Sequence, residues 1–200
     1  MKESAAALTP PHIAEDINAR IARQVRTRRA ALGLSLDALA ANCSVSRSMI
    51  SLIERGESSP TAVVLEKIAT GLGLPLAALF ADPAAPVDPV ARAADRVSWR
   101  DPQSGYLRRN ISPSNFPSPL QIVEVELPAG ARVAYETGAR PAGIHQQIWV
   151  RQGSLELTLG RRSWRLGEGD CVAMQLNEPT IFRNRTRKPV RYIVVIASQP

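Results

Sequence analysis

The segment Gly143–Gly153, with the sequence GIHQQIWVRQG, contains the only histidine in the second half of the chain. A histidine near the start of an apolar run that ends at a turn glycine is typical of strands in metal-binding barrels. Most transition-metal sites need three or four nitrogen, sulfur or oxygen ligands, and one imidazole is too few. His145 therefore indicates a metal site, the remains of one, or an ordinary strand.

The segment Ser46–Arg55, SRSMISLIER, has the spacing of a helix that could bind DNA. Ser46 is a good N-cap, and the helical period turns three apolar side chains inward: Met49, Ile50 and Ile53. The outer face then carries Arg47, Ser48, Ser51 and Arg55. Arginine can contact guanine edges, serine can contact bases or phosphates, and first-turn amides can hold a phosphate. An ordinary amphipathic helix has the same pattern, so the neighbouring elements must decide between the two interpretations.

Helical periodicity extends over about the first 80 residues and predicts five helices. Glycines after the first and third helices, and serines before the second and third, supply stop and start signals. The predicted helices span about residues 15–31, 35–43, 46–56, 59–71 and 75–80, the fourth beginning at Ser59-Pro60. A tight turn around Ser44 and Val45 joins the second helix to the third, which is the geometry of a helix-turn-helix.

After residue 81 the pattern changes to short apolar alternations between turns that contain glycine or proline. Seven strands are predicted, over residues 120–127, 144–150, 154–159, 163–166, 171–176, 180–184 and 191–197. Short, evenly spaced strands favour a β-sandwich or a small barrel. A proline-rich segment between the halves has the composition of a linker. The expected division is a helical domain at 14–80, a linker at 81–97 and a β domain at 98–198.

The helical half resembles the Cro/lambda-repressor-like (XRE) helix-turn-helix family over about residues 14–80. The resemblance is carried by LA, VSRSMIS, IERG, SP, KIA and PL, which follow one another in this order. It implies binding to double-stranded DNA through the third helix. The residues that the family pattern and the helix surface select as DNA contacts are Ser35, Ser46, Arg47, Ser48, Ser51 and Arg55.

Two further features of the helical half follow from the same resemblance. The glutamate of the IERG motif typically pairs with an arginine of the first helix, and its distance from Gly33 makes Arg28 the expected partner of Glu54. The second residue of the second helix is often a glutamine that touches DNA, and here it is Leu36. That contact is therefore absent, and Ser35 and the third helix must carry more of the binding.

The second half resembles a small cupin domain over about residues 105–197. The segments IWVRQGSLELTLGRRSWRLGEGDCVAM and PTIFRN carry the resemblance. It implies a double-stranded β-helix, which is an antiparallel barrel with a ligand cavity. A helix-turn-helix followed by a cupin is a familiar arrangement for transcriptional regulators.

Metal-binding cupins place two histidines one residue apart, then a glutamate, then a late histidine. His145 matches the first position, but Gln147 occupies the second and Thr180 the last. The glutamate position falls, depending on the register, at Gln146, Arg151 or Gln152. Amides and hydroxyls bind divalent transition metals poorly, so we expect no metal and no cofactor. These neutral groups instead suit a small polar ligand in a cavity lined by His145, Gln147, Trp149, Met174 and Thr180.

Composition agrees with a soluble DNA-binding protein. The 200-residue chain has a net charge of +7, carried almost entirely by arginine, which suits phosphate or carboxylate partners. No apolar window is long enough for a membrane span, the N-terminus lacks a signal-peptide core, and the two cysteines suggest no disulfide framework. A cytoplasmic location without membrane contact is expected.

These patterns together predict a sequence-specific transcriptional regulator, a repressor, that binds its operator as a homodimer. The cupin-like domain is expected to sense a small-molecule effector, to dimerise, or both. The alternative is an enzyme in which a metal-dependent cupin is fused to a DNA-binding domain. A third possibility is a DNA-binding scaffold whose barrel is empty and serves only for assembly.

Overall fold

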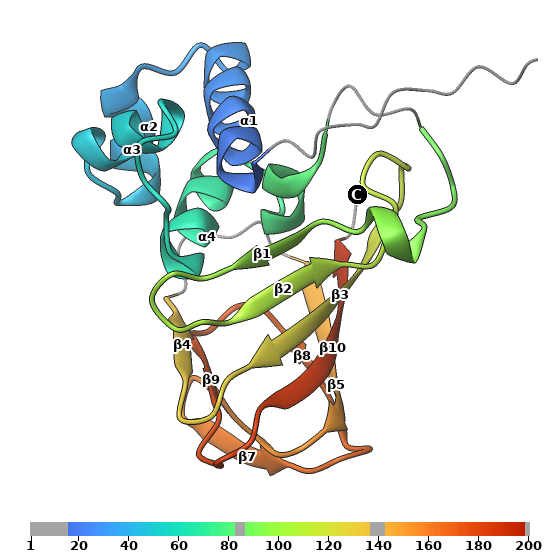
Figure 1. Cartoon of the computed structure of the whole chain (residues 1–200). Coiled ribbons are helices and arrows are strands. Elements are labelled where there is room, and N and C mark those ends of the chain that lie inside the picture. Colours follow the sequence, from blue (N-terminus) through green and yellow to red (C-terminus); the bar gives the residue numbers. More distant parts are fainter. Residues whose placement is uncertain (1–15, 83–86, 137–142, 199–200) are drawn as a thin grey trace, which may run out of the picture.

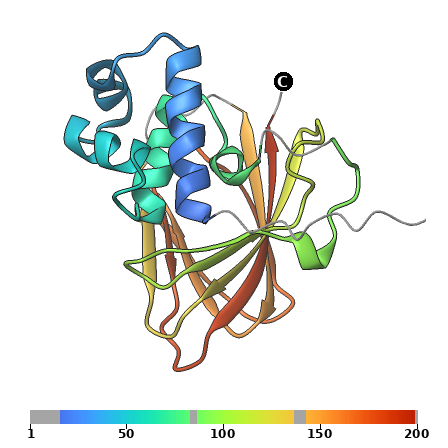
Figure 2. The same ribbon diagram turned by 45° about the horizontal axis from the view of Figure 1, so that its top comes forward.

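The computed structural model describes residues 16–82, 87–136 and 143–198. A helical half built from the N-terminal residues sits at one end of a β-rich half (Figures 1 and 2). Within the described residues, no helix is both long enough and apolar enough to cross a membrane.

The described part of the helical half contains four α-helices, where the sequence predicted five. The helices are α1 (Ile17–Ala31), α2 (Leu36–Cys43), α3 (Arg47–Glu54) and α4 (Ala62–Gly71). The predicted fifth helix is the 3-10 helix η1 (Leu76–Phe80). A second 3-10 turn, η2 (Ala93–Asp95), lies in the predicted linker. The segment of residues 76–80 has hydrogen bonds between residues three apart, such as that from the Ala78 N–H to the Pro75 carbonyl. It is too short to propagate an α-helix.

The helix starts follow from capping side chains. Ser35 and Ser46 are the N-caps of α2 and α3, as predicted. The start of α4 differs from the prediction, because Thr61 rather than Ser59 is its N-cap and accepts a hydrogen bond from the Val64 amide. Between α2 and α3, Ser44 adopts a left-handed conformation with φ of +53°, which closes the tight turn.

Residues 87–136 and 143–198 contain ten strands in two antiparallel sheets. The strands are β1 (Ser98–Arg100), β2 (Leu107–Asn110), β3 (Leu120–Leu127), β4 (Arg132–Tyr135), β5 (Ile144–Gln152), β6 (Leu155–Leu159), β7 (Arg162–Leu166), β8 (Cys171–Gln175), β9 (Thr180–Arg183) and β10 (Val190–Ser198). One sheet has the order β1-β2-β3-β10-β5-β8 and the other β4-β9-β6-β7.

The two sheets do not form a closed barrel in this structure. Among the described strands, no hydrogen-bonded pair joins a strand of one sheet to a strand of the other. The sheets are held together by a shared apolar core that includes Val125, Ile148, Leu157 and Phe182. The sequence analysis missed β1, β2 and β4, because these strands are only three or four residues long and lack a run of alternating apolar residues.

Aromatic and charged contacts join the helical half to the β-rich half. Trp99 of β1 packs on Phe80 of η1 with ring centroids 5.7 Å apart. Lys67 of α4 forms an ion pair with Glu136, which follows β4, with Nζ 2.8 Å from the carboxylate. The buried carboxylate of Asp101 accepts a hydrogen bond of 2.9 Å from the Ala62 N–H at the start of α4. Helix α4 is therefore fixed to the sheet at its N-terminus and along one side.

Replacing Asp101 with asparagine is expected to lower the free energy of unfolding by about 2 kcal/mol. Asp101 also accepts hydrogen bonds from the backbone amide and the hydroxyl of Ser104. In the asparagine variant, the side-chain NH2 replaces one carboxylate oxygen and cannot accept a hydrogen bond, so at least one of these donors loses its acceptor. Urea unfolding of Asp101→Asn and of Asp95→Asn, an exposed aspartate of η2, measures the difference. Equal stabilities of the two variants would show that Asp101 does not anchor α4.

Candidate functional site

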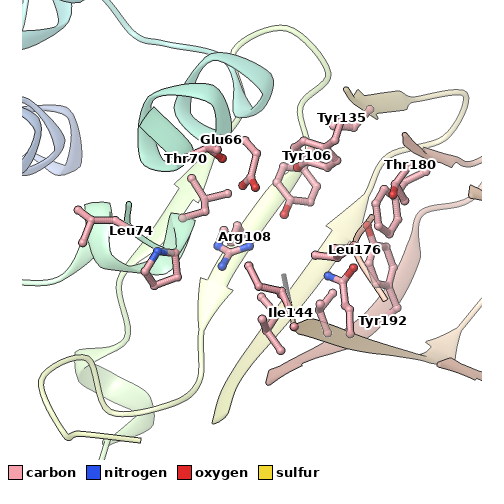
Figure 3. Close-up of a pocket in the computed structure, with 18 of the residues that line it drawn as sticks. Glu66, Thr70, Leu74, Tyr106, Arg108, Tyr135, Ile144, Leu176, Thr180 and Tyr192 are labelled. Carbon is pink, nitrogen blue, oxygen red and sulfur yellow. The ribbon is translucent and has the colours of Figure 1, made fainter. Parts of the chain in front are cut away.

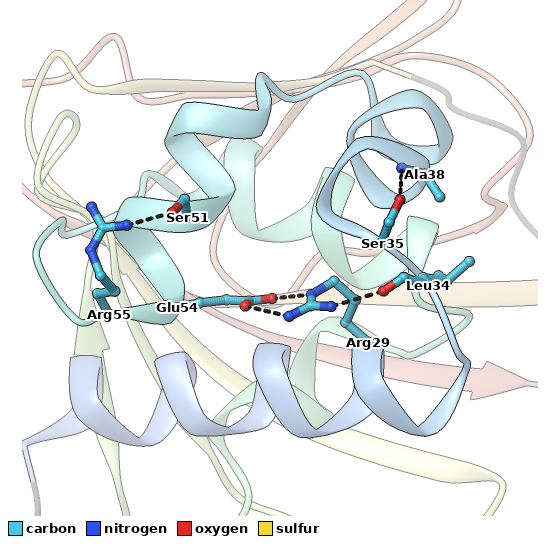
Figure 4. Close-up of polar contacts among 7 residues, drawn as sticks. All are labelled: Arg29, Leu34, Ser35, Ala38, Ser51, Glu54 and Arg55. Atoms are coloured by element: carbon cyan, nitrogen blue, oxygen red, sulfur yellow. Dashed lines mark hydrogen bonds and ion pairs between the residues drawn. The ribbon is translucent and has the colours of Figure 1, made fainter.

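The six residues predicted to contact DNA lie at two helix N-termini and along α3. The Ser35 hydroxyl accepts a hydrogen bond of 3.0 Å from the Ala38 N–H (Figure 4). The Ser46 hydroxyl accepts one of 3.2 Å from the Met49 N–H. The Ser48 hydroxyl lies 3.2 Å from that of Ser46. The capping hydroxyls are thus already engaged, and the two helix N-termini present positive partial charge to an incoming phosphate.

The two arginines of this surface are held differently. Arg47 has a side-chain exposure of 63%, and its Nε lies 3.3 Å from a carboxylate oxygen of Asp37, itself 76% exposed. Arg55 donates two hydrogen bonds of 2.8 Å to Glu57 and a further one to Ser51 (Figure 4). The Arg55 hydrogen bonds lower the pKa of Glu57. Arg47 therefore needs to leave only one solvent-exposed ion pair to reach DNA, whereas Arg55 must exchange a two-pronged one.

The ion pair that fixes α3 to α1 is formed by Arg29, and the predicted pairing of Glu54 with Arg28 is wrong. Arg29 Nε and Nη2 donate to the two Glu54 oxygens at 2.6 and 2.8 Å, and Nη1 donates to the Leu34 carbonyl at 2.8 Å (Figure 4). Successive helix residues point about 100° apart, so only one of the two neighbours can face α3. The hydrogen bond to Glu54 raises the pKa of Arg29 against the opposing effect of burial.

A cavity of about 310 Å³ lies between the helical half and the interior of the β-rich half. Helix α4 and the loop that follows it supply one wall, and strands of both sheets supply the others (Figure 3). The lining residues from the helical half are Glu66, Thr70, Gly73, Leu74, Pro75 and Leu76. Those from the β-rich half include Tyr106, Arg108, Val133, Tyr135, Gln146, Leu176, Thr180, Phe182, Tyr192, Val194 and Ile196.

Polar groups of the cavity wall from the β-rich half are mostly buried, whereas Glu66 and Thr70 of α4 are partly exposed. Arg108 is only 5% exposed, and within the described residues its Nε and one Nη have no hydrogen-bond partner. Burial raises the pKa of Tyr135 and of Tyr192 well above its usual range, so both phenols stay neutral and can donate a hydrogen bond. The sequence analysis missed Arg108, because the segment LRRN carries no signal that one of its arginines is buried.

Only some of the residues predicted to line a ligand cavity do so. Thr180 lies in the cavity wall, and Met174 is buried but outside the lining. His145, Gln147 and Trp149 are exposed side chains of β5 that do not line the cavity. Alternate strand residues face opposite sides, so the inward set is Gln146, Ile148 and Val150. The apolar pair in this set is the signal that would have placed Gln146, not its neighbours, in the cavity.

The residues at the cupin metal positions do not fit a metal ion. His145 and Gln147 lie on the outside of the sheet while Thr180 lies in the cavity wall, so their side chains do not converge. In the part of the chain that the structure describes, no group of three or more His, Cys, Asp or Glu side chains is placed to hold a metal.

Comparisons with known proteins agree with the geometry of α2 and α3. Residues 25–79 match the family model HTH_3, helix-turn-helix. The chain is 29% identical over 174 residues to the HTH-type transcriptional regulator SutR of Escherichia coli (strain K12). The aligned region covers 85% of this chain and 88% of SutR.

Two solved structures are also similar. The crystal structure of an HTH_3 family transcriptional regulator from Vibrio cholerae has a TM-score of 0.77 and 27% identity, covering 92% of this chain and 98% of the other. The cupin_2 domain of an XRE family transcriptional regulator from Enterobacter cloacae has a TM-score of 0.45 and 19% identity, covering 49% of this chain and all of that domain. With the α2–turn–α3 arrangement in place, the chain is a transcriptional regulator with an XRE-type helix-turn-helix DNA-binding domain, followed by a β-rich domain.

Proposed function

We propose that this regulator is a repressor that binds an operator as a homodimer and whose β-rich, cupin-like domain senses a small molecule and dimerises. The helical domain at 14–80 binds DNA, and residues 98–198 form the effector and dimerisation domain. Residues 81–97 are the linker between the two domains. A protein bound at an operator can repress by its presence there, so repression requires no surface for contact with a further protein. The observation that carries the proposal is the exposed Arg47 at the capped N-terminus of α3.

Helix α3 enters the major groove by its N-terminal end in this proposal. Arg47 and Ser48 then face base edges, while Ser35, Ser46 and the first-turn amides of α2 and α3 face phosphates. Ser51 and Arg55 lie further along the same helix. Arg47 leaves Asp37 for the DNA, and the net charge of +7 favours approach to the phosphate backbone.

Selection of binding sites from random DNA duplexes, followed by footprinting, tests the proposal. A homodimer of helix-turn-helix domains should enrich an inverted repeat whose half-sites are about 10 base pairs apart from centre to centre. The footprint should cover both half-sites at once. Enrichment of no sequence, or protection of an isolated half-site, would contradict the proposal.

The exposed face of the six-stranded sheet supports dimerisation. This face carries three large apolar side chains, Leu120, Ile122 and Trp149, which are 50%, 38% and 42% exposed. They belong to neighbouring rows of the same face, because Ile122 pairs with Val195 and Trp149 pairs with Ile193. The solvent face of an antiparallel sheet is ordinarily polar, and an apolar one suits an isologous contact with a second copy.

Replacing Ile122 with glutamate is expected to convert the homodimer to monomers, because two copies of the carboxylate would meet across a desolvated two-fold contact. Analytical ultracentrifugation measures the mass of the variant in solution. The control is Val87→Glu, which changes an apolar side chain that is 67% exposed and belongs to no strand. Sedimentation of Ile122→Glu and Val87→Glu as the same species would contradict this interface.

The proposal assigns no catalytic step to the cupin-like domain. The positions that a metal-binding cupin uses hold an imidazole and an amide on the outer face, and a hydroxyl in the cavity. Such groups neither converge on one point nor provide the charge that a divalent transition metal needs. The cavity itself has the chemistry of a binding site, with apolar walls and few polar groups.

A further inference from the structure

We propose that the cavity between α4 and the sheets binds a small organic carboxylate, and that Arg108 holds the carboxylate group. This inference rests on the proposed function, because it names the class of effector that the β-rich domain would sense. The cavity, at about 310 Å³, is at the lower end of the range for small-molecule sites, so the ligand is small.

Arg108 carries the argument. Its side chain is 5% exposed and lines the cavity, and its Nε and one of its Nη atoms have no hydrogen-bond partner in the part of the chain that the structure describes. The guanidinium carbon lies 5.8 Å from the centre of the Phe80 ring, a contact that satisfies none of its donors. A buried cation without a hydrogen-bonded anion is unfavourable, and a guanidinium matches a carboxylate with two parallel hydrogen bonds.

The other walls define the rest of the ligand. Val133, Leu176, Phe182 and Val194 give the cavity an apolar surface that suits an aliphatic or aromatic body. The neutral phenols of Tyr135 and Tyr192 lie in the same wall and can donate to the carboxylate. Figure 3 shows Arg108 among residues from the helices and residues from the sheets. The geometry therefore points to a monocarboxylate with an apolar body, held at one end by Arg108.

The position of the cavity connects the ligand to the DNA-binding helices. Thr70 of α4 and Leu74 of the following loop line one side, and the sheets line the other. Helix α4 is packed tightly on α2, since a Cβ at Gly71 would lie 2.7 Å from the Cβ of Cys43. A ligand that contacts both halves favours one arrangement of α2 and α3 relative to the sheets. Binding of ligand and of DNA are then linked, and each changes the affinity for the other.

Thermal unfolding of the full chain with benzoate and phenylacetate, and with the neutral benzamide and phenylacetamide, tests the site. At about a hundredfold excess over Kd, a carboxylate should raise the Tm of the wild type by about 5–10 °C, and the amides should not. Arg108→Met should abolish the shift, and Arg108→Lys, which keeps the charge but loses the planar fork, should reduce it. Arg109→Met is the control, because Arg109 of the same strand is paired with Glu124 at 3.2 Å.

Three results would overturn the inference: no Tm shift with either carboxylate, equal shifts with the amides, or an unchanged shift in Arg108→Met. Arg108→Met should itself fold at least as well as the wild type, because it replaces an unpaired buried cation with an apolar side chain. If that variant does not fold, the response of Arg108→Lys decides.

DNA binding by the same preparations separates this inference from the proposed function. Carboxylate should change the affinity of the wild type for a selected duplex at least about fivefold and leave that of Arg108→Met unchanged. Selective DNA binding without a carboxylate response would overturn the inference and leave the proposed function standing. A carboxylate response through Arg108 in a chain that selects no DNA sequence would contradict the proposed function and keep the site.

Discussion

Replacing Glu54 with alanine is expected to lower the free energy of unfolding by about 3–5 kcal/mol. Glu54 is 8% exposed and accepts two short hydrogen bonds from Arg29, whose third donor reaches the Leu34 carbonyl. The alanine variant leaves the guanidinium partly buried without its anion. The same change releases α3 from α1 and from the loop before α2, so the orientation of the DNA-binding helix depends on this pair.

Urea unfolding of three variants measures the effect. Glu57→Ala is the control, because Glu57 also makes a two-pronged pair with an arginine but lies on the surface, where such pairs contribute about 1 kcal/mol or less. Arg29→Ala should destabilise about as much as Glu54→Ala, and the double variant should cost less than the sum of the two. Equal stabilities of Glu54→Ala and Glu57→Ala would show that the Arg29–Glu54 pair does not hold α3.

Replacing Arg47 with alanine is expected to weaken binding to a selected operator by about 1–3 kcal/mol, or roughly 5- to 150-fold. Arg47 is the arginine that lies within α3, and among the described residues its ion-pair partner is the exposed Asp37. Losing that surface pair should leave the stability almost unchanged. The loss of affinity would therefore report a contact with DNA and not a damaged fold.

Fluorescence anisotropy at fixed salt measures this change. Arg161→Ala is the matched control, because it removes the same charge from an exposed turn of the β-rich half, between β6 and β7. Strand β7 is labelled in Figure 1. A base contact predicts a larger loss on the selected duplex than on a scrambled one, whereas a phosphate contact predicts equal losses. Equal effects of Arg47→Ala and Arg161→Ala on the selected duplex would remove Arg47 from the DNA interface.

The helical half could be predicted from sequence because its signals are local. The caps at Ser35 and Ser46 and the buried stripe of α3 depend on residues only a few positions apart. The ends were less certain for the same reason: Thr61 displaced Ser59 as the cap of α4, and a segment of five residues became a 3-10 helix. Choosing between Arg28 and Arg29 required the position of α1 relative to α3, which no local pattern supplies.

The cavity could not be predicted in the same way. The sequence analysis predicted that His145 and Gln147 of β5 line the cavity, whereas Gln146 does. An error of one residue is enough, because neighbouring residues of a strand face opposite sides. His145 matches a metal-ligand position of cupins, which favoured the wrong face, although the apolar Ile148 and Val150 indicate which face of β5 is buried. Arg108 becomes buried only when β2, α4 and η1 come together, and it has no sequence signature. Tertiary contacts between distant segments therefore decide the ligand chemistry.

The proposed function depends on sequence-specific recognition of DNA by α3. It is tested most directly by the ratio of the affinities of the wild-type chain for a selected duplex and for a scrambled duplex of equal length and composition. Measured at one salt concentration, that ratio should be at least about 1,000, and Arg47→Ala should reduce it about fivefold or more. Equal affinity of the wild type for the two duplexes would contradict such recognition.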